Sequence, residues 1–240
     1  LNVNEDDLIK KINPKTKCIF LVNVHGNSCD LFKIKKIAKK KNIILIEDNC
    51  ESLGSKLKNK KLGSFGDFGT FSFFYSHQIT SGEGGMVVCN NDNDYEILFA
   101  LRSHGWLGGT RFYPRRLKSY NYYAKKYPKL DPRYIFVNSG FNLRPTDIQA
   151  SIGLNQFKRL NKLISNRNLN RKLIIDTIKK DKRWKNQFSF IEPAKNISPS
   201  WMGLPIIINK KYKNKKMNFL NYLDKKGIET RPIISGAFTN

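Results

Sequence analysis

Apolar and polar positions alternate in blocks along the first fifty residues of the chain. Residues 18–24 (CIFLVNV) and 43–47 (IILIE) are apolar, β-branched runs, which are typical of buried strands. Between them, apolar residues recur at helical spacing over 31–38, directly after Asp30, a residue type that favours helix N-termini. Strand, helix and strand at this spacing predict a parallel βαβ unit with a right-handed crossover, and hence an α/β fold.

The middle of the chain continues this pattern with two further strands and a long loop. The runs 69–74 and 86–89 predict strands, and the polar turn between them carries His77. Residues 94–104 predict a short helix. The Tyr-, Pro- and Arg-rich stretch from about 105 to 138 predicts a long loop, and loops of that length are often functional.

The last hundred residues predict a second α/β unit. Thr146 and Gln149 have the spacing of a capping box at the start of a long helix, which extends with an interruption to about Lys180. The segments GLPIIIN and IETRPI predict strands, and the helix between them ends at Gly227. We expect residues 1–160 to form part of a large domain and 161–240 part of a small C-terminal domain.

Composition and charge narrow the possible partners. The 240 residues are 40% hydrophobic, which is enough for a core, and the net charge is +25. Nucleic-acid binding is one interpretation of this charge. We favour the interpretation that the lysines are spread over solvated helix faces and that the protein has no nucleic-acid partner, because no nucleic-acid-binding motif accompanies the charge. With no apolar run of about 18 residues and no N-terminal signal pattern, we expect no membrane association.

Two further features concern the chain ends and the cysteines. The chain has no initiating Met and stops after an extended-looking segment, so we expect a fragment truncated at both ends. The four cysteines are scattered, without a CxxC pair, so we predict no metal site and no disulfide framework. Cys18, Cys50 and Cys89 lie in or beside apolar runs and are interpreted as buried thiols. Scattered cysteines without a disulfide framework fit a location in the reducing cytoplasm.

Two positions carry candidate chemistry. Asp48 follows the second predicted strand, and open parallel sheets bind ligands beyond the carboxyl ends of their strands. The alternative is a solvated loop carboxylate. His77 lies in a turn between strands, where it is a candidate general base, a candidate metal ligand or simply a turn residue.

Longer stretches carry a resemblance to a known family. The segment from Ile46 to Val88 (IEDNCESLGSKLKNKKLGSFGDFGTFSFFYSHQITSGEGGMVV) resembles the DegT/StrS-type sugar aminotransferases, and the similarity continues through ALRSHGW, SGFNLRPTDIQASIGLNQF and GIETRPIISG. The resemblance implies the fold-type I fold of pyridoxal-phosphate enzymes, with a mostly parallel sheet between helices and a small C-terminal α/β domain. In that family the position of His77 is normally the lysine that binds the cofactor covalently.

The histidine implies a particular branch of the family. FSFFYSHQITSGEGG is similar to the motif of the sugar-nucleotide 3-dehydratases, which serve dideoxysugar synthesis for surface polysaccharides. The resemblance implies pyridoxamine 5'-phosphate held non-covalently, alternating with pyridoxal 5'-phosphate, and glutamate as the amino donor. His77 would be the catalytic base, since imidazole titrates near neutral pH. Asp48 would keep the cofactor's pyridine nitrogen protonated.

Other residues are assigned by the same resemblance. Ser72 and Asn142 match residues that bind the cofactor phosphate, Asn142 from the neighbouring subunit of a homodimer. Glu51 stands near the cofactor's phenolic oxygen, where the family usually has Gln or His. The alternatives for these positions are an ordinary strand serine at Ser72 and a turn residue at Asn142.

The long loop bears on the substrate. It contains no cysteine, so we expect no iron–sulfur cluster, which normally needs four thiolates. The cluster-free relatives imply GDP-4-keto-6-deoxymannose as substrate, and Arg111, Arg115 and Arg116 are candidates for binding its diphosphate. Two other functions stay open: an aminotransferase, although no lysine lies between Ser64 and Thr80, and a non-catalytic basic binding protein on the same fold.

Overall fold

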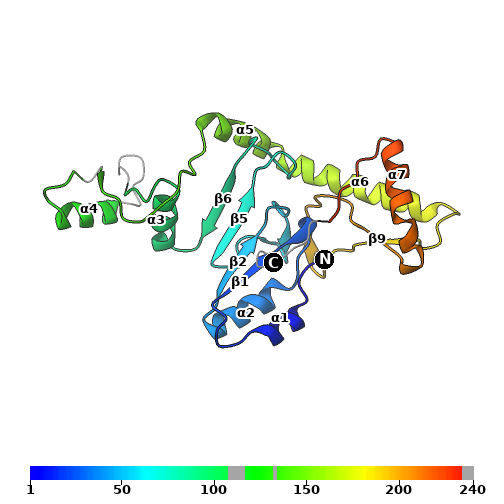
Figure 1. Cartoon of the computed structure of the whole chain (residues 1–240), viewed down its shortest axis with the longest axis horizontal. Coiled ribbons are helices and arrows are strands. Elements are labelled where there is room, and N and C mark those ends of the chain that lie inside the picture. Colours follow the sequence, from blue (N-terminus) through cyan, green and yellow to red (C-terminus); the bar gives the residue numbers. More distant parts are fainter. Residues whose placement is uncertain (108–116, 132–133, 234–240) are drawn as a thin grey trace.

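The computed structural model describes residues 1–107, 117–131 and 134–233. Its main sheet has the strand order β1-β2-β5-β6, in which β1, β2 and β5 are parallel and β6 is antiparallel to β5. The molecule is elongated, with α3 and α4 at one end, α7 at the other and the sheet between them (Figure 1).

The predicted βαβ unit is confirmed. Strand β1 (Cys18–Val22) leads through the short 3-10 helix η1 (Val24–Gly26) into helix α2 (Leu31–Lys41), which returns the chain to strand β2 (Ile44–Asp48). The Asp30 side chain caps α2 by accepting hydrogen bonds from the backbone N–H groups of Phe32 and Lys33. Asn42 ends α2 in a left-handed conformation, with φ of 53°.

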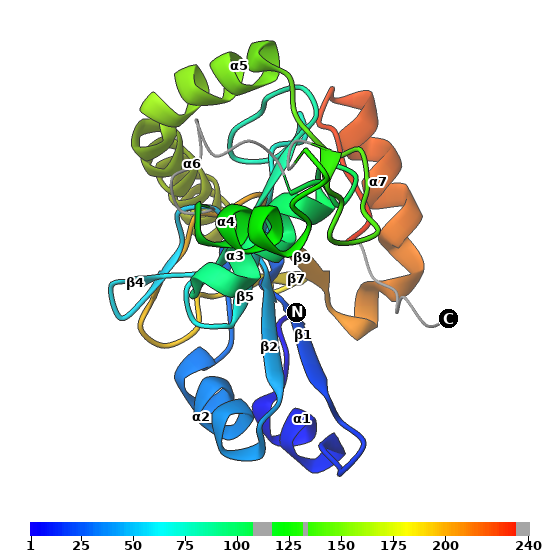
Figure 2. The same ribbon diagram turned by 90° about the vertical axis from the view of Figure 1, so that its left-hand side faces the viewer.

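One face of this unit forms the core. The buried residues come from β1, α2, β2 and the chain that follows β2: Ile19, Leu21, Cys29, Leu31, Ile34, Ala38, Ile43, Leu45, Leu57, Leu62 and Phe65. Leu8 of helix α1 (Glu5–Lys11) packs against the same core. Helices α1 and α2 lie together at the bottom of the view in Figure 2, and α5 lies at the top.

The opposite face of the first two strands is open, which corrects the prediction of fully buried strands. Cys18 is exposed, and Phe20 and Ile44 are 50% and 47% exposed. Successive side chains of a strand point to opposite faces, so a layer of helices on one face buries only alternate residues. The prediction of buried thiols at Cys18, Cys50 and Cys89 is wrong: among the cysteines only Cys29, at the entry to α2, is buried.

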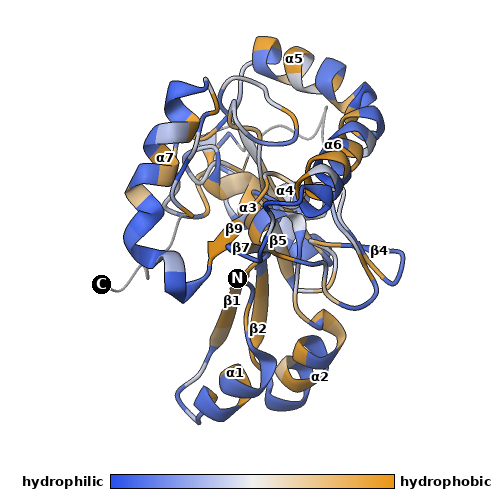
Figure 3. Ribbon diagram, turned by 90° about the vertical axis from the view of Figure 1, so that its right-hand side faces the viewer, coloured by the Kyte–Doolittle hydropathy of each residue, from blue (hydrophilic) through white to orange (hydrophobic). Residues whose placement is uncertain are grey.

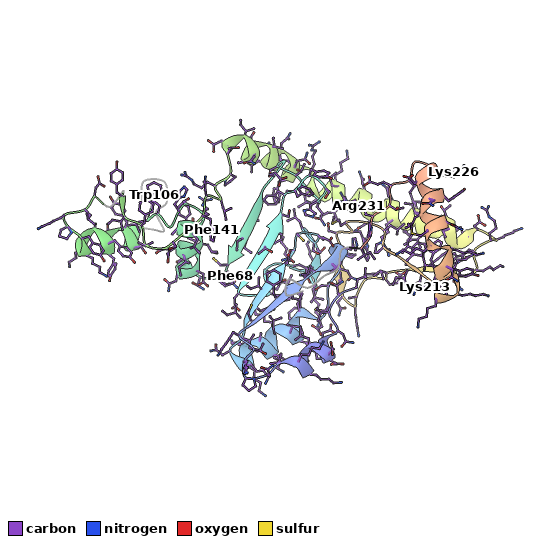
Figure 4. All side chains as sticks on the ribbon, viewed as in Figure 1. Phe68, Trp106, Phe141, Lys213, Lys226 and Arg231 are labelled. Atoms are coloured by element: carbon purple, nitrogen blue, oxygen red, sulfur yellow. The ribbon has the colours of Figure 1, made fainter. Side chains whose placement is uncertain are left out.

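The strands beside His77 form as predicted, within a residue or two. Strand β5 (Phe68–Ser72) pairs with β6 (Gly85–Cys89), and helix α3 (Asp92–Leu101) follows. The stretch from 105 to 138 is not an uninterrupted loop, because it contains helix α4 (Leu117–Lys126). Phe141, beyond this stretch, lies beside β6 (Figure 4).

The predicted long helix is two helices, α5 (Asp147–Lys158) and α6 (Leu160–Lys180). The capping box of Thr146 and Gln149 is present, and the break is at Arg159, whose φ and ψ are −98° and −2°. Beyond α6, strands β7 (Phe188–Phe190) and β9 (Ile206–Ile208) form an antiparallel pair. The 3-10 helix η4 (Lys210–Lys215) and helix α7 (Lys216–Lys225) follow. The strand predicted for IETRPI is wrong over residues 228–233, which are irregular.

A small sheet joins the two halves of the chain. Strand β3 (Lys56–Leu57) pairs with β4 (Lys60–Lys61) on one side and with β8 (Ile197–Ser198) on the other. This pairing brings residue 200 next to the loop that follows β2.

The charged and apolar residues are distributed unevenly. Strands β1 and β2 are hydrophobic, whereas α1 and much of α7 are hydrophilic (Figure 3). Lys213 and Lys226 lie at the end of the molecule that is remote from the main sheet (Figure 4). Among the described residues, no helix has both the length and the apolar composition that crossing a bilayer requires.

Candidate active site

A buried polar network fixes the carboxyl ends of β1 and β2. The Asn23 side-chain amide donates to Asn49 Oδ1 at 2.8 Å, and the Asn49 amide donates to the Glu47 carbonyl at 3.1 Å. Ser28 Oγ donates to Asn23 Oδ1 at 2.5 Å. Buried polar groups that satisfy one another hold a fixed arrangement, so these strand ends form a rigid base for the site. Asn23 and Asn49 were not predicted as site residues from the sequence, although each directly follows a strand of the main sheet.

Glu47 and Asp48, adjacent in sequence, have different roles. Glu47 is fully buried, and its carboxylate accepts hydrogen bonds from the backbone N–H groups of Gly63, Phe65 and Gly66 at 2.6–2.8 Å. It therefore holds the 63–66 loop. Asp48 is half-buried at the end of β2, and its carboxylate accepts a hydrogen bond from the Cys50 N–H at 2.9 Å and interacts with the thiol of the same residue. Asp48 is thus the one available for a ligand.

His77 lies in a turn that is held against Phe74. Its backbone N–H donates to the Phe74 carbonyl at 3.1 Å, and the two rings meet edge to face at 5.9 Å. The imidazole Nδ1 is buried and has no hydrogen-bond partner. Burial lowers the pKa of His77 below its ordinary value of 6.5, while the nearby carboxylates of Glu51 and Asp48 act in the opposite direction. Burial thus favours the neutral ring, and both carboxylates act on it electrostatically.

Glu51 is tied to the end of β1. Its Oε2 accepts a hydrogen bond from the His25 backbone N–H at 2.6 Å and lies 3.9 Å from His25 Nδ1. Between Asp48 and Glu51, burial raises the pKa of the Cys50 thiol to about 12, and a hydrogen bond with Asp48 adds to this effect. The thiol is therefore uncharged at neutral pH, and the ionisable groups of the site are Asp48, Glu51 and His77.

Ser72 closes the site on the side of β5. It is the last residue of that strand, where it pairs with Gly85, and its Oγ accepts a hydrogen bond from the Phe74 N–H at 3.2 Å. Since the hydroxyl acts as acceptor in this bond, its own hydrogen is available for a ligand.

The structure does not bring every predicted residue into this group. Asn142 is exposed and pairs with Ser103 in an isolated β-bridge, and no described contact joins it to Asp48, Glu51 or His77. Arg111, Arg115 and Arg116 lie outside the described residues. Within the described part of the chain, no three His, Cys, Asp or Glu side chains are grouped so that they could hold a metal ion.

The grouped residues fit a phosphorylated pyridine cofactor. A carboxylate with free acceptor capacity (Asp48) suits a protonated pyridine nitrogen, and a hydroxyl with a free hydrogen (Ser72) suits a phosphate oxygen. The unpartnered imidazole of His77 supplies a proton acceptor close to them. The donor set thus matches such a cofactor without any lysine.

Comparison with known proteins gives a consistent result. The model of the DegT/DnrJ/EryC1/StrS aminotransferase family matches residues 1–239. A GDP-4-keto-6-deoxy-D-mannose 3-dehydratase of Escherichia coli O55:H7 is 36% identical over 239 residues, which is 99% of this chain and 58% of the relative. The chain therefore spans little more than half the length of that relative.

Solved structures show the same likeness. The structure of an E. coli GDP-4-keto-6-deoxy-D-mannose-3-dehydratase with bound hydrated PLP superposes with a TM-score of 0.83 at 34% identity. A 3-dehydratase of the same name with a trapped PLP-glutamate geminal diamine gives 0.82, also at 34% identity. In both cases the match covers 100% of this chain and 59% of the other. The fold is therefore that of the PLP-dependent aminotransferases, and the chain belongs to the DegT/DnrJ/EryC1/StrS aminotransferase family.

Proposed function

We propose that the protein is a pyridoxamine-phosphate-dependent 3-dehydratase of a nucleotide-linked 4-keto-6-deoxyhexose, with GDP-4-keto-6-deoxymannose as substrate. The observation that carries this proposal is His77, a half-buried imidazole whose Nδ1 is buried and unpartnered and which the carboxylates of Glu51 and Asp48 influence electrostatically. The aminotransferases of the family have a lysine at this position. The likeness to the sequence and the solved structure of a GDP-4-keto-6-deoxy-D-mannose 3-dehydratase supports the substrate.

Each residue has a definite task in this proposal. Asp48 keeps a positive charge on the pyridine nitrogen, Ser72 donates to the phosphate, and Glu51 stands near the phenolic oxygen. Pyridoxamine phosphate, when bound, supplies the amine that engages the sugar's 4-keto group and the electrons that expel the 3-hydroxyl. His77 accepts and returns a proton at an imidazole nitrogen, which a neutral ring does efficiently.

The amino donor in this proposal is glutamate. A cycle that loses the cofactor's amino group as ammonia needs a donor to restore it. Support comes from the structure of the related 3-dehydratase with a trapped PLP-glutamate geminal diamine.

We further propose that the protein works as a homodimer. Large apolar side chains on both sides of Asn142 and along α5 are 58–74% exposed: Phe136, Phe141, Leu143, Ile148, Leu154 and Phe157. An apolar surface of this extent marks an interaction site. With a second copy bound there, the exposed Asn142 would bind the cofactor phosphate of the neighbouring subunit.

The division into domains and the location complete the proposal. We place the boundary between a large unit (1–160) and a small unit (161–240) at the helix break of Arg159, which supports a division there.

We place the protein in the cytoplasm, where thiols remain reduced, because all four cysteines are free.

Borohydride reduction tests the proposal against its main alternative. The full-length protein, loaded with pyridoxal phosphate and reduced, should carry no covalent label, whereas His77→Lys should be labelled. A lysine amine can attach to the aldehyde, and an imidazole cannot form a stable attachment. A labelled wild-type protein would instead favour an aminotransferase with its lysine elsewhere.

A further inference from the structure

Gln78, the residue after His77, links three parts of the chain that are far apart in sequence. Its side chain is 3% exposed. Its amide Nε2 donates both hydrogens to backbone carbonyls, one of Glu51 and one of Ser200, the latter at 3.2 Å. The turn that carries His77 is thereby fastened to the loop after β2 and to the chain beyond β8.

The buried Gln78 amide lowers the stability of the fold in one respect. Gln78 Oε1 is buried and has no hydrogen-bond partner. An unpaired buried acceptor destabilises the folded state, and an apolar side chain of the same shape would avoid that penalty. The advantage of glutamine at this position therefore lies in its two donated hydrogen bonds.

Both acceptors of Gln78 belong to fixed segments. The Ser200 N–H donates to Ser55 Oγ at 2.9 Å, and that hydroxyl donates to the Gly26 carbonyl at 2.8 Å. A side chain at Gly26 would overlap the Ser200 carbonyl, so the two backbones are in close contact. The Glu51 side chain is in turn held by the His25 N–H. Gln78 thus connects the turn to two anchors that do not depend on it.

The remaining hydrogen bonds of the turn leave His77 without an equivalent support. The Ser81 N–H and the Thr80 hydroxyl both donate to the Phe73 carbonyl, at 3.0 and 3.2 Å, which closes the turn at its base. At its tip, the His77 N–H bonds to Phe74, which is part of the same turn. The Gln78 amide is the described hydrogen bond that joins the tip to the rest of the site.

We propose that Gln78 is a positioning residue for His77, and that the Gln78 amide fixes the imidazole relative to Glu51 in the loop after β2 and hence to Asp48 at the end of that strand. The inference rests on the proposed function of His77 as a base. It adds a residue that touches no reacting atom and that sets the distance between the base and its two neighbouring carboxylates.

The test replaces Gln78 by methionine, which has a similar length and cannot donate. In the full-length protein we expect kcat to fall about 10- to 100-fold, because misplacing a catalytic group by about 1 Å costs on the order of 100-fold. KM should change less than about 2-fold. NMR titration should show the pKa of His77 rising toward its ordinary value as the ring becomes more solvated, since burial is the main cause of its lowering.

Two controls separate positioning from packing and from stability. Ser55→Ala also removes two buried hydrogen bonds, one with Ser200 and one with Gly26. It should lower the urea midpoint of unfolding while leaving the titration of His77 unchanged. Gln78→Glu keeps the shape but cannot donate as a carboxylate, and should lose activity as Gln78→Met does.

The outcomes are distinct. A Gln78→Met protein with wild-type kcat, or with an unchanged His77 titration, would overturn the inference, as would a fully active Gln78→Glu. If the wild type itself performs no dehydration, the proposed function fails, and the NMR titration still tests whether Gln78 positions the ring.

Discussion

Replacing Glu47 by glutamine should destabilise the fold by about 3–5 kcal/mol, although the two side chains have the same shape. One carboxylate oxygen of Glu47 accepts from Phe65 and Gly66, and the other accepts from Gly63. In the variant, the amide oxygen can serve only one of these two positions. The amide NH₂ then faces a backbone N–H, and two donors meet in a fully buried site.

The magnitude follows from these three bonds. The orphaned N–H costs about 1–3 kcal/mol, and each remaining bond weakens by about 1 kcal/mol because a charged acceptor becomes neutral. With a urea m-value of about 3 kcal/mol/M, the unfolding midpoint should fall by about 1–1.7 M.

Urea unfolding followed by circular dichroism measures this shift, with Glu229→Gln, at an exposed position, as the matched control. The control should unfold within about 0.2 M of the wild type, since surface substitutions change stability by less than about 0.5 kcal/mol. A Glu47→Gln variant as stable as the control would refute the reasoning that Glu47 holds the 63–66 loop.

Three further predictions concern individual side chains. Asp48→Asn should lose most activity yet keep the wild-type unfolding midpoint, because asparagine cannot hold a proton on the pyridine nitrogen by charge; turnover near wild type would exclude Asp48 as the ring's partner. The acid limb of kcat/KM against pH should have its midpoint below 6.5, since the base must be neutral and burial lowers the pKa of His77; a midpoint clearly above 6.5 would contradict this. Iodoacetamide at pH 8 should modify the exposed Cys18 well before Cys29, whose pKa burial raises to about 12, as peptide mass spectrometry would show; equal rates would contradict the described burial.

Much of the fold could be predicted because its signals are local. The apolar runs of β1 and β2, the cap of Asp30 and the capping box of Thr146 depend on neighbours a few residues away, and all are confirmed. The exposure of Cys18 was not predictable, because which face of a strand is covered depends on elements distant in sequence. The strand predicted at 228–233 failed for the same reason, since β-pairing requires a partner.

In the candidate site, too, local features could be predicted from the sequence and long-range contacts could not. Asp48 could be identified from its place at a strand end, and His77 from its place in a turn together with a family motif. The different roles of Glu47 and Asp48 follow from their opposite directions on one strand, and the two acceptors of Gln78 come from residues 27 and 122 positions away. Such long-range polar contacts leave no periodic pattern in a sequence.

Product analysis tests the central claim most directly. The full-length protein would be incubated with pyridoxamine phosphate and GDP-4-keto-6-deoxymannose, and the sugar nucleotide formed would be identified by mass spectrometry. We expect a keto product with one oxygen atom fewer than the substrate, and almost none of it with His77→Asn. A 4-amino product that retains the 3-hydroxyl would contradict a dehydratase function and identify an aminotransferase.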